Sequence, residues 1–114
     1  METDKKNILI IDDDFATREL IESLFMDEEQ YAVLKAENAE QGLSLLETQN
    51  VDIILLDIMM HQIDGYEFCR KVRNVSKNKA IPIIILTAKH QQTDIQEGIK
   101  AGADEYVTKP FDLD

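Results

Sequence analysis

The sequence has little of several residue types, and each shortage limits what the protein can be. It contains a single cysteine, Cys69, so no internal disulfide can form, and a reducing, cytoplasmic setting is expected. Proline and glycine are sparse (2 and 4 residues), and we find no repeat, low-complexity tract or linker. No apolar run approaches the roughly 20 residues that span a bilayer. Residues 1–6 lack the apolar stretch of a secretory signal, so we expect one globular domain without a membrane segment.

Basic residues are also few, with 12 Lys and Arg against 23 Asp and Glu and a formal net charge of −11. A chain this acidic, without a basic stripe, is not expected to bind nucleic acid directly. Several bases gather within residues 70–79, and we interpret them as a helix C-terminus and a solvated turn rather than a docking patch. The apolar content of 44% is ordinary for a chain of 114 residues with one core.

β-branched runs alternate with amphipathic segments along the chain, which is typical of repeated βαβ units in an α/β fold. Strands are predicted over residues 7–11, 31–36, 51–56, 81–86 and about 104–107. Right-handed crossovers would place them in a doubly wound parallel sheet with helices on both faces. Periodicity alone does not fix the strand order. In the order 2-1-3-4-5, the first and third strands would be neighbours.

Turn and cap signals predict where the four intervening helices begin and end. N-terminal caps are expected at Asp14, Asn38 (with Gln41 in a capping box), Asp64 and Thr93, and a left-handed C-terminal residue at Gly102. The first helix is expected to bury Leu20, Ile21, Leu24 and Phe25 and to leave Arg18 off this face, and the fourth to bury Ile95 and Ile99. Cys69 and Tyr106 are interpreted as packing residues.

Polar side chains follow four of the predicted strands. Asp12 and Asp13 follow the first strand, Asp57 the third, Thr87 the fourth and Lys109 the fifth. The carboxyl ends of parallel strands meet at one edge of a sheet, so these side chains should converge there. Each has an ordinary alternative, such as a cap or a turn residue, but their joint placement at successive strand ends favours one pocket.

Such a pocket suits a divalent metal and a phosphoryl group. Clustered carboxylates take up a cation, and Mg²⁺ prefers a few hard oxygen ligands and bridges to phosphate oxygens. Asp13 and Asp57 would be direct ligands, and Asp12 would hold a metal-bound water. Lys109 and Thr87 would contact the phosphoryl oxygens. Asp57 would then be the nucleophile that forms an acyl phosphate.

These residues, with the motifs around them, resemble the receiver domain of two-component response regulators. The matching motifs are residues 8–14, 55–60 with Asp64-Gly65, 84–88, 98–106 and 109–111. The resemblance covers essentially the whole chain, which we take as a single receiver domain over residues 1–114. It implies a flavodoxin-like five-stranded parallel sheet in the order 2-1-3-4-5.

The resemblance also implies a function. Asp57 would accept a phosphoryl group from a sensor histidine kinase, from a phosphotransfer protein or from a small phosphodonor, with Mg²⁺ bound by Asp13, Asp57 and the backbone carbonyl of Met59. Thr87 and Tyr106 would then move and remodel the face of the fourth helix and fifth strand, which controls an output domain or partner. Such a protein is a phosphoacceptor switch rather than an enzyme.

The family resemblance also bears on a peptide bond and on two histidines of the predicted loops. The bond between Lys109 and Pro110 is usually cis in the family. His61 stands where the family usually has proline, which should loosen the loop after Asp57. His61 and His90 have no second His or Cys at metal-ligand spacing, so both are interpreted as exposed loop residues.

The chain stops near residue 114, where the family's last helix normally begins. We therefore expect a C-terminally truncated domain that lacks this helix and leaves apolar side chains of the fourth and fifth strands open. Self-association, as a homodimer or a segment-swapped dimer, is the expected consequence.

Two other functions use similar residues. A Mg²⁺-dependent phosphohydrolase with the same nucleophile would need a second Asp two residues after it, where Met59 stands. A flavin-binding electron carrier would need a Ser-, Thr- or Gly-rich phosphate loop after the first strand, where three aspartates would repel the phosphate.

Overall fold

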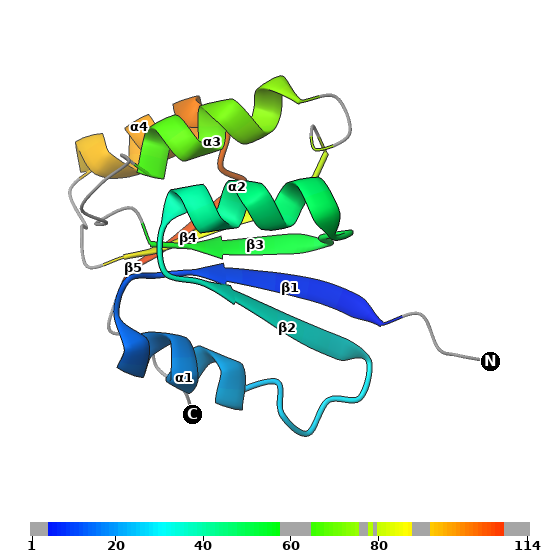
Figure 1. Ribbon diagram of the computed structural model, residues 1–114. Coiled ribbons are helices and arrows are strands. Elements are labelled where there is room, and N and C mark those ends of the chain that lie inside the picture. Colours follow the sequence, from blue (N-terminus) through cyan, green and yellow to red (C-terminus); the bar gives the residue numbers. More distant parts are fainter. Residues whose placement is uncertain (1–4, 58–64, 76–77, 79, 88–91, 109–114) are drawn as a thin grey trace.

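A computed structural model of the chain describes residues 5–57, 65–75, 78, 80–87 and 92–108. Its elements are β1 (Lys6–Ile11), α1 (Phe15–Ser23), β2 (Tyr31–Ala36), α2 (Ala39–Thr48), β3 (Ile53–Leu56), α3 (Gly65–Asn74), β4 (Ile83–Thr87), α4 (Gln92–Ala101) and β5 (Glu105–Thr108). The strands pair in parallel in the order β2-β1-β3-β4-β5, which confirms the expected topology (Figure 1). Within these ranges no helix is both long and apolar enough to cross a bilayer.

The sheet separates two apolar clusters. Alternate residues of β1 point to opposite faces, so Leu9 and Ile11 join one cluster while Ile8 and Ile10 join the other. All four are at most 2% exposed, which is why the strand reads as a continuous aliphatic run. Helices α2, α3 and α4 lie on one face, and α1 lies on the other (Figure 1). Cys69 is fully buried in the larger cluster, as a packing residue should be.

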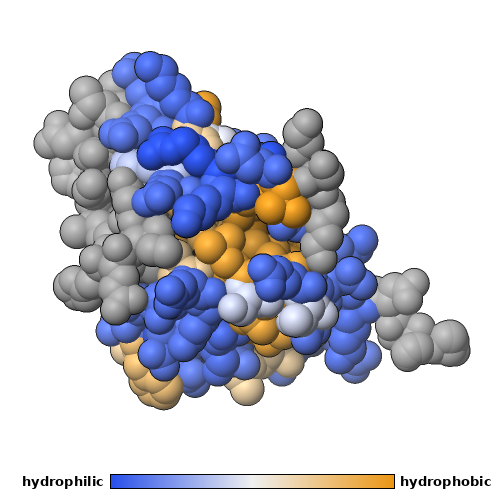
Figure 2. Space-filling model, turned by 45° about the horizontal axis from the view of Figure 1, so that its top comes forward, coloured by the Kyte–Doolittle hydropathy of each residue, from blue (hydrophilic) through white to orange (hydrophobic). Residues whose placement is uncertain are grey.

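The face of the molecule that carries α2, α3 and α4 is mostly hydrophilic at its surface. Figure 2 shows charged and polar side chains over most of this view, with apolar surface near its centre and in smaller areas along its lower edge. Glu67, Arg70 and Lys71 are all exposed on α3, while Phe68 and Val72 on the same helix are fully buried. The helix therefore has the amphipathic pattern expected of an element that packs on a sheet.

Three of the expected caps are confirmed. The Asp14 carboxylate accepts a hydrogen bond from the Thr17 amide (3.1 Å), and the Asn38 side chain accepts one from the Gln41 amide (2.8 Å). Gln41 reaches back as predicted, although its side-chain oxygen accepts from the amide of Glu37. Gly102 ends α4 with a φ of 119°, the left-handed region that glycine favours.

The predicted cap at Thr93 is wrong, and Asp64 lies outside the described residues. Helix α4 already begins at Gln92, so Thr93 has helical backbone, whereas an N-cap residue does not. Ile99 is 47% exposed rather than buried. Its neighbour Gly98 faces the sheet, where a Cβ would lie 3.0 Å from side-chain atoms of Ile85 and Tyr106, so Ile99 points away. The side chain of Ile95 is outside the described part of the chain.

The buried face of α1 also differs from the expected one. Leu20 and Leu24 are 44% and 47% exposed, whereas Arg18 is only 8% exposed. Ile21 is buried, and Arg18 lies three residues before it, on the same side of the helix. The stripe that contacts the sheet therefore runs through Arg18, Ile21 and the partly buried Phe25, and the two leucines flank it.

Ion pairs tie α1 to β2. The Lys35 ammonium donates to the carboxylates of Glu22 (2.7 Å) and Glu19 (3.1 Å). These hydrogen bonds, that of Glu22 first, raise the pKa of Lys35 above its ordinary value. Because the groups are exposed, we assign the pairs an orienting role rather than a large stabilising one.

Arg73 joins four elements at the edge of the sheet opposite the carboxyl ends of the strands. Its guanidinium donates to the carbonyls of Gly102 (2.7 and 2.9 Å) and Ile81 (2.6 Å) and to the carboxylate of Asp104 (2.8 Å). The same carboxylate accepts the amide of Ile83 at 2.9 Å. One side chain of α3 therefore fixes the end of α4 and the beginnings of β4 and β5.

Replacing Arg73 with methionine should lower the free energy of unfolding by about 2 kcal/mol or more, since several charge-assisted hydrogen bonds are lost together. Urea unfolding followed by circular dichroism measures this. The matched control is Arg70→Met, an exposed arginine of the same helix, which should change stability by less than about 0.5 kcal/mol. Equal effects of the two substitutions would contradict the assigned role.

Apolar side chains of β4 and β5 are incompletely covered on the face that carries α1. Ile84 and Leu86 are half-buried, and Val107 is 37% exposed. Among the described helices, α1 is alone on this face, and it packs over β1 and β3 (Figure 1). The absence of the last helix and self-association through this strip both stay predictions.

If the strip mediates self-association, Val107→Lys should reduce the concentration-dependent rise in mass of the 114-residue chain, because a charge would have to be buried. Sedimentation velocity over a range of concentrations measures it. Val75→Lys is the control, since Val75 is a comparably exposed valine (47%) directly after α3. A wild-type chain that stays monomeric throughout would refute the prediction.

Candidate metal and phosphoacceptor site

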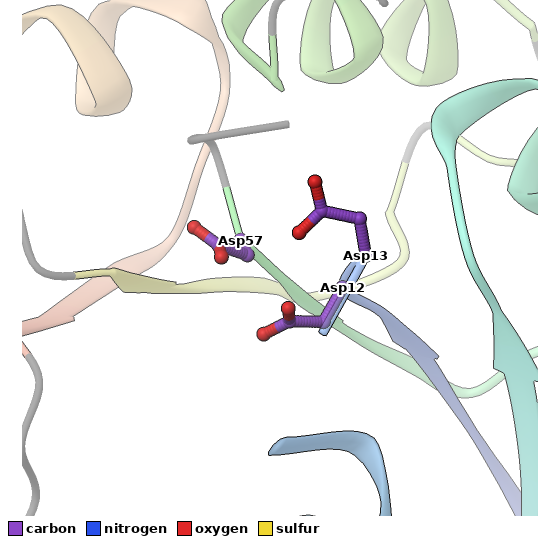
Figure 3. A group of neighbouring side chains, drawn as sticks. All are labelled: Asp12, Asp13 and Asp57. Atoms are coloured by element: carbon purple, nitrogen blue, oxygen red, sulfur yellow. The ribbon is translucent and has the colours of Figure 1, made fainter. Parts of the chain in front are cut away.

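Three carboxylates meet at the carboxyl edge of the sheet. Asp12 and Asp13 directly follow β1, and Asp57 directly follows the neighbouring strand β3 (Figure 3). One carboxylate oxygen from each lies within 4.8 Å of the other two. Asp12 and Asp57 are 2% and 8% exposed, while Asp13 is exposed. The sequence prediction that these residues converge is therefore confirmed by the geometry.

The sheet itself holds two of these residues in place. The amide of Asp57 donates to the carbonyl of Ile11 (2.9 Å), and the amide of Asp12 donates to that of Ala36 (3.2 Å). Both bonds continue the parallel ladders one residue beyond the strands. The carboxylates are thus carried on backbone that cannot move apart without breaking sheet hydrogen bonds.

The turn between β1 and α1 is fixed by further hydrogen bonds. The Asp12 carboxylate accepts the amide of Asp14 at 2.9 Å, and Asp14 in turn caps α1. The guanidinium of Arg18 donates to the backbone carbonyl of Asp12 at 2.7 Å. The ring of Phe15 lies over that guanidinium, 5.6 Å from ring centroid to Cζ. Sequence analysis missed Arg18, because its place in the chain suggested a solvated helix face.

The donor set fits a hard divalent cation. Two like charges at about 5 Å repel by about 3 kcal/mol at an effective dielectric constant near 20. A cation among the three carboxylates would replace this repulsion with attraction. All three offer oxygen, the ligand type that Mg²⁺ prefers, and Asp13 is exposed.

The other predicted site residues are described only in part. Thr87 is the last residue of β4 and pairs with Thr108 of β5, so its backbone lies at the same edge of the sheet. Its side chain is not described. Met59, Lys109 and Pro110, together with His61 and His90, fall outside the described residues. Their predicted roles therefore stay predictions.

Tyr106 lies on β5 and is half-buried against the larger cluster, as expected of a packing aromatic. Its ring lies close to Gly98 of α4, where a Cβ would come within 3.0 Å of the ring carbon Cδ2. The same Cβ would come equally close to Cδ1 of Ile85. The ring therefore occupies space that exists because residue 98 has no side chain.

Comparison with known proteins places this geometry in a family. The family model of the response regulator receiver domain matches residues 8–114. The chain belongs to that family. The expected recognition is therefore confirmed. Members of the family act in two-component signal transduction, where a histidine kinase phosphorylates the receiver.

Individual relatives agree with the family. The receiver is 40% identical over 110 residues to the transcriptional regulatory protein ResD of Bacillus subtilis (strain 168), covering 96% of this chain and 44% of that protein. It is 41% identical over 104 residues to the transcriptional regulatory protein AfsQ1 of Streptomyces coelicolor, covering 91% and 44%. The chain thus spans less than half the length of these relatives. The structure of the chemotaxis protein CheY4 of Vibrio cholerae is similar with a TM-score of 0.86 at 30% identity, covering 95% of this chain and 89% of that one.

If repulsion among the three carboxylates destabilises the metal-free receiver, Asp13→Asn should stabilise it by about 1 kcal/mol in the presence of a chelator. The same substitution should remove most of the stabilisation that Mg²⁺ gives the wild type. Differential scanning calorimetry with and without Mg²⁺ measures both effects. Asp27→Asn, in an exposed turn, is the control and should change neither. A less stable Asp13→Asn that still responds fully to Mg²⁺ would count against the site.

Proposed function

We propose that Asp57 of this receiver accepts a phosphoryl group and that Mg²⁺ bound beside it is required. The observation that carries the proposal is the cluster of Asp12, Asp13 and Asp57, whose oxygens lie within 4.8 Å of one another at the ends of adjacent strands. Asp57 is the member that directly follows β3, next to the turn after β1 that supplies the other two. It is the most suitable nucleophile, because the other two can then hold the cation.

The reaction is a displacement at phosphorus. A carboxylate oxygen of Asp57 attacks the phosphoryl group of a donor, such as a phosphohistidine. The P–N bond of the donor breaks, its electron pair stays on the ring nitrogen, an acyl phosphate forms, and the imidazole leaves in neutral form after taking up a proton from solvent. The backbone bond from the Asp57 amide to the Ile11 carbonyl (2.9 Å) holds the nucleophile in place during the transfer.

Asp12, Asp13 and Asp57 would hold Mg²⁺, together with the backbone carbonyl of Met59. When bound, the ion supplies positive charge that offsets the carboxylates and the phosphoryl oxygens. Lys109 and Thr87 would contact those oxygens. The position of Thr87 at the end of β4 supports its part in this proposal.

Phosphorylation would be read out through α4 and β5. Thr87 and Tyr106 belong to neighbouring strands, since Ile85 pairs with Tyr106 and Thr87 with Thr108. Tyr106 also packs against α4 at Gly98. A movement of Thr87 toward a phosphoryl group would therefore free space for the Tyr106 ring and change the α4–β5 face, which is a two-state switch.

The partners follow from the family and its relatives. The donor would be a histidine kinase or a phosphotransfer protein, and the setting cytoplasmic. ResD and AfsQ1 are called transcriptional regulatory proteins and are more than twice as long as this chain. We infer that the receiver controls an output domain or a separate partner rather than binding nucleic acid itself. It would act as a switch modified on its own aspartate, not as an enzyme that turns over a substrate.

The test is the intact mass of the receiver after incubation with phosphoramidate, with and without Mg²⁺. We expect the wild type to gain one phosphoryl group only with Mg²⁺, and Asp57→Asn to gain none. Asp52→Asn is the matched control, because Asp52 is exposed near the other end of the same strand, and it should be phosphorylated like the wild type.

Two outcomes would contradict the proposal. One is a folded wild type that gains no mass, and the other is an Asp57→Asn variant that gains as much as the wild type. Steady release of many phosphates per protein would indicate a phosphohydrolase instead of a switch.

A further inference from the structure

We infer that Arg18 is a positioning residue for the cation site, acting through the backbone of Asp12 and not by contact with the cation or phosphoryl group. The inference rests on the proposed Mg²⁺ site. Arg18 comes from α1, and its guanidinium donates a hydrogen bond of 2.7 Å to the carbonyl of Asp12. Arg18 thus contacts the backbone of the proposed ligand Asp12, and the next residue in the chain is the second proposed ligand, Asp13.

The environment of Arg18 suggests a specific role. It is 8% exposed, and long charged side chains are seldom buried without a definite partner. Its guanidinium donates to a main-chain oxygen of the β1–α1 turn, and the face of Phe15 covers the guanidinium at 5.6 Å. An arginine placed to stabilise the helix alone would not need to reach back to the last residue before the exposed ligand.

The bond completes a set that fixes Asp12 from three sides. The Asp12 amide donates to the Ala36 carbonyl at 3.2 Å, its carboxylate accepts the Asp14 amide at 2.9 Å, and its carbonyl accepts from Arg18. The first two bonds orient the residue within the chain. The third sets the peptide plane between Asp12 and Asp13 and hence the direction in which the Asp13 carboxylate leaves the backbone.

Positioning and simple electrostatics predict opposite results when Arg18 is removed. A positive charge near the site opposes cation binding, so an electrostatic role alone would make a neutral variant bind Mg²⁺ more tightly. If the arginine orients the ligands, the neutral variant should bind more weakly. Loss of groups that orient metal ligands typically weakens metal affinity about 10- to 100-fold.

The experiment is isothermal titration calorimetry of the receiver with Mg²⁺ alone, at fixed pH and ionic strength. We expect Arg18→Met to weaken binding about tenfold, because the peptide plane is no longer held. Arg18→Lys keeps the charge but not the planar fork of donors, and it should fall between wild type and Arg18→Met. Phe15→Ala removes the covering ring from an exposed position (66%) and should weaken binding by a smaller factor.

Ile21→Ala is the matched control, since it disturbs the same buried stripe of α1 without touching the turn. It should lower the melting temperature but leave the Mg²⁺ affinity within about twofold of the wild type. A change that small is clearly distinct from the tenfold loss expected of Arg18→Met. Phe15→Ala keeps the test open should Arg18→Met fail to fold.

Several results would overturn the inference. One is that Arg18→Met binds Mg²⁺ as tightly as the wild type or more tightly. Another is that Ile21→Ala loses as much affinity as Arg18→Met. If Arg18→Met does not fold, the contradicting result is a Phe15→Ala variant with unchanged affinity. If the wild type itself binds no Mg²⁺, the proposed function fails first. A wild type that binds while Arg18→Met binds equally well would refute the role of Arg18 alone.

Discussion

The fold holds three carboxylates close together despite their mutual repulsion, and the proposed function depends on this arrangement. Asp12, Asp13 and Asp57 keep oxygens within 4.8 Å of one another, although separated carboxylates in water would be more stable. The sheet imposes the arrangement, because the parallel ladders extend one residue beyond β1 and β3 and carry two of the carboxylates on hydrogen-bonded backbone. The strands can pair this way because they are buried on both faces, so core burial stabilises a charge cluster that would be unstable by itself. A cation is the natural means of relieving that stored repulsion.

Stabilising contacts and the proposed ligands lie at opposite ends of the strands. At one edge Arg73 joins α3 to the end of α4 and the beginnings of β4 and β5, in hydrogen bonds that involve backbone carbonyls and one carboxylate. At the other edge lie the proposed ligands and the end of β4. Between them, Tyr106 packs against Gly98 of α4. The proposed switch elements are thus anchored by Arg73 at the end of the sheet opposite the proposed ligands.

The strand ends and the three carboxylates were predicted from the residues themselves, because they depend on strong local signals. The strand order was predicted only from the resemblance to receiver domains. Continuous aliphatic runs are buried on both faces, and the residue after such a run must lie at a sheet edge. The burial of helical residues was predicted less well. Arg18 is buried and Leu20 is 44% exposed, since the stripe that meets the sheet is fixed by the crossing of α1 over β1 and β3, which no local pattern encodes. Thr93 failed as a cap for a related reason, since where α4 begins does not depend on cap propensity alone.

The central claim is that the three carboxylates form one cation site. The most direct measurement is a Mg²⁺ titration of the isotopically labelled receiver followed by amide chemical shifts. The account predicts one saturable site, with the largest shifts at Asp12, Asp13 and Asp57, which belong to two separate segments of the chain. Shifts centred instead on the exposed acidic turn at residues 27–29, or no saturable binding by the folded protein, would contradict it.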